Sequence, residues 1–333
     1  KLVAFYASDG SIDERAFLKH VGQCLIEHGK GRLLDEGPAI TAVPLPCLAL
    51  PGMMVEIEAI AIAQDSTTDR VTANPEGLTP LPAPFCHGIR HGSHAWVSAQ
   101  PTSWSSNTTA ESSNLCEQTA EMMNRIKTIL VELGADFGDI VRTGCWYRGD
   151  GTVRSWEDQA VERGKHFSDN PPASTELPTP SLPDGELARV DAWAIRGLNG
   201  QSLERKAYHS ERWDWPLSLP YPAAIHCQDL VFLSAHLPVD SSGEVLSHQD
   251  LNGQTRTVME NTVHTLSGFG LTLNHMVKQT SFFFGKADRN DIVTNQTLRS
   301  SFYSEPAGAS TGVPMPALAM EDTMVTVDTI AMT

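Results

Sequence analysis

Hydrophobic and polar positions follow the same order of elements more than once along the chain. In the middle of the sequence, two short apolar segments meet at Gly92-Ser93, which predicts a pair of strands. A stretch with apolar residues at helical spacing follows, and Gly134 supplies its C-terminal cap. The predicted order is β-β-α-β-α-β, with strands at 84–92 and 94–100, a helix at 112–133, a strand at 139–147, a helix at 156–167 and a strand at 187–195.

The same order returns near the C-terminus, and its latter half is present near the N-terminus. The later copy has predicted strands at 223–226, 230–236, 277–284 and 324–332, and predicted helices at 251–268 and 292–303. The earlier copy has predicted strands at 1–7 and 54–63 and a predicted helix at 13–28. The opening β-β-α half is absent from the earlier copy. An upstream segment of roughly 60–80 residues, or a partner in a homo-oligomer, is expected to complete it.

A recurring segment marks the end of each copy. Residues 38–61, 172–195 and 306–331 each contain Ala-x-Thr-x-[Val/Leu]-Pro-x-Pro-x-Leu, or a close variant of it, followed by an alternating apolar strand. Their spacing of roughly 135 residues is that of a whole domain rather than a short structural repeat. The chain is therefore predicted to be a tandem array of one fold.

Domain boundaries follow from this repeat and from composition. The expected arrangement is half of a first unit at 1–64, a second unit at 84–197 and a third at 212–333, joined by linkers at 65–83 and 198–211 that are rich in polar residues, Gly or Pro. Each full unit is expected to be a four-stranded sheet with two helices on one face. The opposite face is too apolar to remain exposed, so the units are predicted to pack as a pseudo-trimer of the α+β class.

Composition narrows the functional classes. The net charge of −16 argues against nucleic acid and against an anionic membrane surface, because both require a basic surface. No apolar run approaches the ~18 residues of a spanning helix. The six cysteines form no Cys-x-x-Cys pair, which favours free thiols in a reducing compartment and hence a cytoplasmic protein. A small-molecule ligand is the expected partner.

Three motifs resemble the Rid/YjgF superfamily, the reactive-intermediate deaminases, also known as endoribonuclease L-PSP-like proteins. They are LPGMMVEIEAIA at 50–61, WVSAQP at 96–101 and VFLSAHLP at 231–238, in the β-β-α-β-α-β order. The resemblance implies chorismate-mutase-like units that assemble as trimers, with small-molecule sites in the clefts between them. It also implies three site positions: an Arg after Pro-Ala that holds a carboxylate, a Glu on the last strand that positions water, and a Ser that lines the pocket.

This chain has some of the family's site residues and lacks others. The Ser is kept as Ser98 and Ser234, and the last-strand Glu as Glu56. Ile40, Ser174 and Ser310 replace the carboxylate-binding Arg, and neither residue type offers its bidentate grip. The remaining equivalents are Arg189 and Thr326 at the position of Glu56, and the acidic series Glu58, Asp191 and Asp328 two residues later.

Each candidate residue has a structural alternative. Glu56 is predicted to be a general base with a raised pKa, or else a carboxylate that accepts backbone hydrogen bonds at an interface. Arg189 is predicted to bring a positive charge to the cleft, or else to form a salt bridge. Ser98 and Ser234 are predicted to bind substrate, since neither has the surroundings of a nucleophile. His236 is predicted to line the substrate site, where its imidazole could act as a general acid or base, or else to be a satisfied polar residue. His87, His91 and His94 do not converge as metal ligands, and no metal or cofactor is expected.

Three functional hypotheses remain open. The first is a hydrolase or deaminase that acts on a small molecule in one diverged cleft, with Glu56 as catalytic residue and with Ser98, Ser234, Arg189 and His236 binding substrate. The second is a ligand-binding or scaffold protein that has lost the chemistry. The third is a chorismatase-like enzyme, whose dianionic substrate would call for basic residues.

Overall fold

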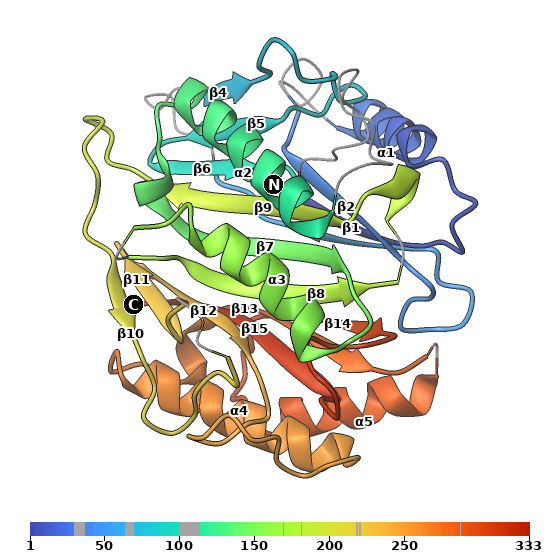
Figure 1. Ribbon diagram of the computed structural model, residues 1–333, viewed down its shortest axis with the longest axis vertical. Helices are drawn as coiled ribbons and strands as arrows, with labels where there is room; N and C mark the ends of the chain where they lie inside the picture. Colours follow the sequence, from blue (N-terminus) through green and yellow to red (C-terminus); the bar gives the residue numbers. More distant parts are fainter. Residues whose placement is uncertain are drawn as a thin grey trace.

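The computed structural model shows three β-sheets whose helices lie on the outside (Figure 1). It describes residues 1–29, 37–63, 70–99, 114–168, 170–180, 182–217, 219, 221–286 and 288–333. The three sheets define three units, called the first, second and third unit in chain order. The α+β class and the tandem units of repeated element order predicted from the sequence are confirmed.

The first unit is a three-stranded sheet in the order β2-β1-β3 with one helix. Strand β1 runs parallel to β2, because helix α1 carries the chain back between them, and antiparallel to β3. Asp13 begins the helix by accepting a hydrogen bond from the amide of Ala16. The bounds are β1 Leu2–Ala7, α1 Glu14–His28, β2 Ile40–Leu45 and β3 Val55–Ala59.

The second unit is a six-stranded sheet in the order β4-β5-β6-β9-β7-β8. Helix α2 begins with a capping box between Asn114 and Glu117 and buries its apolar stripe against the sheet. The bounds are β4 Arg70–Ala73, β5 Gly88–His91, β6 His94–Val97, α2 Leu115–Glu132, β7 Ile140–Arg148, α3 Val153–Gly164, β8 Ala173–Thr179 and β9 Ala188–Ile195.

The third unit repeats this topology, with the strand order β10-β11-β12-β15-β13-β14. Its bounds are β10 Lys206–Tyr208, β11 Ala224–Cys227, β12 Leu230–His236, α4 Leu251–Ser267, β13 Met276–Phe284, α5 Arg289–Ser300, β14 Ala309–Met315 and β15 Val325–Met332. Short 3-10 turns lie at Phe137–Asp139, Pro183–Gly185 and Leu273–His275.

The expectation of four strands in each full unit is wrong, because both edges of each sheet carry one more strand. At one edge, the Pro-rich part of the repeated segment forms β8 and β14, which pair in parallel with β7 and β13. Proline cannot donate to a ladder, so it is confined to edge strands, which is where Pro178 and Pro314 lie. At the other edge, β4 and β10 come from the segments expected to be linkers, apart from residues 65–69, which lie outside the described part of the chain.

The helix-free faces of the sheets pack against one another at the centre of the molecule. The ring of Trp193 in the second unit lies edge-on to Phe232 in the third, with centroids 4.8 Å apart. The rings of Phe5 in the first unit and Phe282 in the third lie 6.2 Å apart. One buried cluster contains side chains of all three units, among them Phe5, Trp146 and Phe282. The apolar face predicted from the sequence is thus buried between the units.

Three ion pairs join the units in a cycle around this centre. In each pair the cation comes from one unit and the carboxylate from the next: first to second, second to third, and third to first. The pairs are Lys1–Asp191, Arg142–Asp328 and Lys278–Glu58, and the two lysine pairs measure 3.0 Å. Each unit therefore contacts both of the others.

Candidate functional site

The strand registers define equivalent positions in the three units. Ile40, Ser174 and Ser310 pair with Leu2, Thr143 and Gln279. Three residues further along the same strands, Phe5, Trp146 and Phe282 pair with Glu56, Arg189 and Thr326. The structure therefore aligns the two series as the resemblance did. The contacts between units are named by the two units that meet. In the 1/2 contact, β2 of the first unit faces β9 of the second. In the 2/3 contact, β8 faces β15, and in the 3/1 contact, β14 faces β3.

The two predicted serines connect neighbouring units through backbone hydrogen bonds. Ser98 Oγ accepts from the amide of Ile40 at 2.9 Å and donates to the carbonyl of Cys86 at 2.8 Å. Ser234 Oγ accepts from the amide of Ser174 at 3.0 Å. Both serines are fully buried. The structure places Ser98 at the 1/2 contact and Ser234 at the 2/3 contact.

Arg189 occupies the 1/2 contact and is neutralised there by two carboxylates. Its Nη1 donates to Glu14 Oε2 at 2.7 Å and to the carbonyl of Ala42 at 2.8 Å, and its Nη2 lies 2.6 Å from Glu186 Oε2. Tyr6 donates to the same Glu14 oxygen at 2.8 Å. Burial opposes the charge of Arg189, but the two carboxylates raise the pKa of Arg189 on balance. The structure does not bring Arg189 to Glu56, which lies in a different contact.

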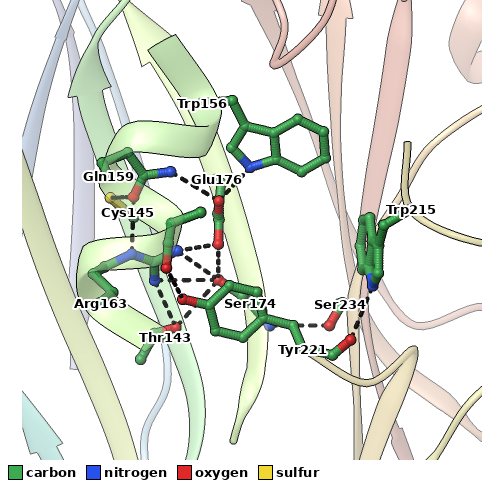
Figure 2. A network of polar contacts seen from close by, with 12 residues as sticks. Thr143, Cys145, Trp156, Gln159, Arg163, Ser174, Glu176, Trp215, Tyr221 and Ser234 are labelled. Carbon is green, nitrogen blue, oxygen red and sulfur yellow. Dashed lines mark hydrogen bonds and ion pairs between the residues drawn. The ribbon is translucent and has the colours of Figure 1, made fainter. Parts of the chain in front are cut away.

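The 2/3 contact holds a buried ion pair that the sequence analysis missed (Figure 2). Arg163, on the last turn of α3, pairs with Glu176 on β8, and both side chains are nearly inaccessible to solvent. The carboxylate of Glu176 also accepts from Trp156, from Gln159 at 2.8 Å and from Ser174 at 2.8 Å.

The surroundings of this ion pair leave little space for a ligand. The guanidinium of Arg163 lies 5.1 Å from the ring centroid of Tyr221, which belongs to the third unit. The salt bridge between Arg163 and Glu176 and the neighbouring aromatic rings thus fill the 2/3 contact. A signal for it was available in the sequence, since an Arg precedes Ser174 by eleven residues and another precedes Ser310 by the same interval.

The 3/1 contact contains Glu56 and is more open than the other two. Strand β14 is exposed at Ala309 and Ser310, whereas β2 and β8 are buried along their whole length. Glu56, on β3, is half-buried, and its Oε2 has no hydrogen-bond partner in the described residues. Burial, with a smaller contribution from the charge of Glu58, raises the pKa of Glu56 to about 7.

His236 lies in the interior of the third unit rather than in a cleft. It is fully buried, with Nδ1 2.7 Å from the carbonyl of Ser234 and Nε2 2.8 Å from the hydroxyl of Thr265. Burial lowers the pKa of His236 to about 4, so the ring is neutral at pH 7. Both ring nitrogens are engaged within the protein, as in the structural alternative.

A small cavity lies where the three units meet. Its volume is about 40 Å³, which is enough to hold ordered water. The rings of three tryptophans and five charged residues of the inter-unit ion pairs line it: Trp96, Trp146, Trp193, Lys1, Asp191, Arg142, Lys278 and Glu58. The described residues contain no group of three or more His, Cys, Asp or Glu side chains that could hold a metal ion. Among them, too, no helix has the length and apolar character needed to cross a membrane.

Comparisons with known proteins agree with this architecture. A family model described as endoribonuclease L-PSP matches residues 216–333. A RutC family protein of Pyrococcus horikoshii is 28% identical over 113 residues, which make up 34% of this chain and 86% of the relative. A RutC family protein of Pyrococcus abyssi is 29% identical over 130 residues, covering 39% of this chain and 98% of the relative.

One solved structure resembles the fold of the whole chain. The crystal structure of a chorismatase superposes with a TM-score of 0.61 and 14% sequence identity, over 99% of this chain and 92% of that chain. At this identity the likeness concerns the fold. The match of the third unit to the family model, together with the similarity to the RutC relatives, supports the resemblance to the Rid/YjgF superfamily.

Proposed function

We propose that the protein is a small-molecule hydrolase that works at the 3/1 contact, with Glu56 as the base that activates water. The observation that carries this proposal is the state of the Glu56 carboxylate, which is half-buried and has an unpartnered oxygen. The residues at the same register position in the other units are satisfied internally: Arg189 by two carboxylates, and Thr326 by the carbonyl of His236 at 2.8 Å.

The raised pKa of Glu56 suits this role. A carboxylate with a pKa of about 7 is ionised in half of the molecules at neutral pH and is basic enough to accept a proton from attacking water. The water oxygen forms a bond to an electrophilic carbon while its proton passes to Glu56. Glu56 then returns the proton to the leaving nitrogen or oxygen. The roles of base and acid are thus combined in one residue.

The other two contacts support the assignment by contrast. Buried ion pairs fill the 1/2 and 2/3 contacts, so a substrate would have to displace Arg189 from Glu14 or Arg163 from Glu176. Removing one member of a buried pair typically costs about 3–5 kcal/mol. A fused array of units can keep one working cleft while the others become structural. The proposal therefore places a single site in each chain.

A chorismatase-like activity is the second candidate. The observation in its favour is the whole-chain likeness of fold to a chorismatase, which a single Rid-like unit does not require. For this candidate too, the proposed site is the 3/1 contact. Incubation of the protein with chorismate, followed by chromatography for its consumption, tests this candidate directly. Loss of any consumption in Glu56→Gln would place the reaction at the 3/1 contact.

The test of the main proposal compares wild type with Glu56→Gln on a panel of imines, enol ethers and esters. A matched control is Glu27→Gln, which changes an exposed glutamate of the same unit. Loss of a general base typically lowers the rate about 10²–10⁴-fold, so turnover should fall by that factor in Glu56→Gln and remain unchanged in Glu27→Gln. Full activity of Glu56→Gln would refute the proposal. Binding of ligands without turnover in wild type would favour the non-catalytic alternative.

A further inference from the structure

A surface groove lies between the third and first units and continues the 3/1 contact. One wall is the turn that follows β2 of the first unit, at residues 46–47. The other wall is the end of β13, at residues 284–286, together with Pro314 and Pro316. The groove has a volume of about 560 Å³. Clefts that hold small molecules typically measure about 300–1,000 Å³, so this groove is large enough for a ligand.

The walls of the groove are almost entirely apolar. Three of the lining residues are prolines, and Phe284 is 48% exposed at the end of β13. Cys47 is half-buried, and Lys286, which is exposed, is the one charged residue among the described residues that line the groove. A concave apolar surface with an exposed aromatic ring is stabilised when a ligand covers it.

The equivalent place at the 2/3 contact is closed. Phe284 and Arg148 are equivalent, since each ends the parallel ladder of its unit. Beyond Arg148, the backbone of Gly151 lies against the third unit. A Cβ atom on Gly151 would be 3.0 Å from Cβ of Ala317 and 3.1 Å from the carbonyl oxygen of Leu318. The second and third units therefore meet there without space for a ligand, whereas the corresponding segments of the third and first units leave the groove open.

The side chain at this strand end also differs among the units. The equivalent position holds Ala7 in the first unit, Arg148 in the second and Phe284 in the third. Of these three residues, only Phe284 supplies an aromatic ring. The apolar groove is therefore specific to the junction of the third unit with the first and is not a feature of the repeated fold.

The extent of the groove favours a small molecule over a protein as its occupant. A stable protein–protein interface typically involves about 20–30 residues on each side. The lining of the groove comes from only a few residues at three strand ends, of which Phe284 and the prolines supply most of the surface. Flat faces of this kind suit an aromatic ring. The ammonium group of Lys286 disfavours a ligand with a positive charge.

We propose that this groove binds a small aromatic molecule, in contact with Phe284 of the third unit and with the proline rings of both units. The ligand class is a flat, apolar ring system without a positive charge. The inference goes beyond the proposed function and does not depend on it, because Glu56 is not among the residues that line the groove.

Ligand-observed NMR on the full chain tests the binding. The probe is 2-naphthol, and its saturated analogue decahydro-2-naphthol should bind several-fold more weakly, because it has no flat ring to stack. Phe284→Ala should weaken binding of 2-naphthol roughly tenfold. The matched control is Val293→Ala on α5 of the same unit, because Val293 is also 48% exposed but does not line the groove. Val293→Ala should bind 2-naphthol as wild type does.

A charged probe tests the role of Lys286. The cation 2-naphthylmethylammonium should bind wild type more weakly than 2-naphthol does. Lys286→Glu replaces the positive charge at the groove by a negative one, at an exposed position, and should reverse this preference. Equal binding of the two probes to wild type and to Lys286→Glu would contradict the placement of the ring beside Lys286.

The thiol of Cys47 locates the bound probe without any substitution. Cys47 lines the groove, whereas Cys24 is exposed on α1. Alkylation by iodoacetamide is followed at each cysteine by peptide mass spectrometry, with and without 2-naphthol. Bound 2-naphthol should slow the alkylation of Cys47 in proportion to the occupied fraction and leave that of Cys24 unchanged. This measurement still decides if Phe284→Ala fails to fold.

Three results would overturn the inference: no binding of 2-naphthol to wild type, equal binding to Phe284→Ala, or alkylation of Cys47 that 2-naphthol does not slow. A different occupant would overturn it as well. If light scattering shows a wild-type dimer that Phe284→Ala converts to a monomer, the groove is a contact between two copies of the chain.

Discussion

The hydroxyl of Ser234 lies 3.0 Å from the backbone amide of Ser174 and accepts its hydrogen bond across the boundary between the second and third units. The same hydroxyl donates to the carbonyl of Pro222 at 2.7 Å. Ser98 makes the equivalent pair of bonds at the boundary between the first and second units, to the amide of Ile40 and the carbonyl of Cys86. A serine that lines the pocket in the family resemblance is here a connector between units.

Ser98→Ala and Ser234→Ala are each expected to destabilise the protein. Each change leaves a buried amide of the neighbouring unit and a buried carbonyl of its own unit without a partner, at a cost of about 1–3 kcal/mol. Urea denaturation measures the change in the free energy of unfolding. Ser241→Ala, at an exposed loop position, is the control and should lie within about 0.5 kcal/mol of wild type. Wild-type stability of both buried variants would show that these bonds are dispensable.

Arg189→Met should be among the most destabilising changes in the chain. It leaves the carboxylates of Glu14 and Glu186 buried without their cation, and breaking such a network typically costs about 3–5 kcal/mol. Adding Glu14→Gln to Arg189→Met removes one of the two uncompensated charges and should recover part of the loss. A double-mutant cycle on Arg189 and Glu14 measures the coupling directly. Strict additivity of the two changes would contradict the proposed network.

Glu56→Gln should stabilise the protein at alkaline pH relative to wild type. The pKa of Glu56 is about 7 in the folded protein, against an ordinary value of 4.5, so between these values the folded state binds more protons than the unfolded state. The contribution of Glu56 to stability is therefore fully present below pH 4.5 and is lost as the pH rises through 7. The Gln variant lacks this decrease. Urea denaturation at pH 4.5 and pH 8 should show its relative stability growing with pH, and an unchanged difference would refute the raised pKa.

His236 should have the opposite pH dependence: its contribution to stability is lost as the pH falls. Its pKa is about 4 in the folded protein and near 6.5 in the unfolded chain, so the unfolded state binds more protons between these values. The contribution is complete above pH 6.5 and is lost as the pH falls through 4. His236→Gln is expected to be less stable than wild type at pH 7, with a smaller difference at pH 4.5. Thermal unfolding across this range measures the trend, and a constant difference would speak against a neutral buried ring.

Much of the fold could be predicted from the sequence, because the same order of hydrophobic and polar positions recurs in each unit. The periodicity predicted the helices and the strands that lie in the middle of each sheet, and the alignment of Glu56 with Arg189 and Thr326 agrees with the strand register. The additional edge strands escaped prediction. Edge strands need only one ladder of hydrogen bonds and accept Pro and polar residues, so their sequences resemble those of linkers.

The candidate site was harder to predict, because it depends on which units touch. Glu56, Ser98 and Ser234 belong to one family site in a symmetric trimer, yet the cyclic order of the units places them at three different contacts. The pairing of Arg163 with Glu176 joins a helix to a strand and has no periodic signature.

The cycle of ion pairs Lys1–Asp191, Arg142–Asp328 and Lys278–Glu58 should keep the units together even when the chain between them is cut. These ion pairs hold each unit to its two neighbours independently of the covalent links between the units. Leu198, in the segment between the second and third sheets, is 76% exposed and suited to proteolytic nicking. A chain cut there should yield two fragments that stay associated under native conditions. Fusion of the units in one chain therefore fixes their number and order, while the contacts between units hold them together. A substitution in one unit does not change the other two, so each unit can diverge separately.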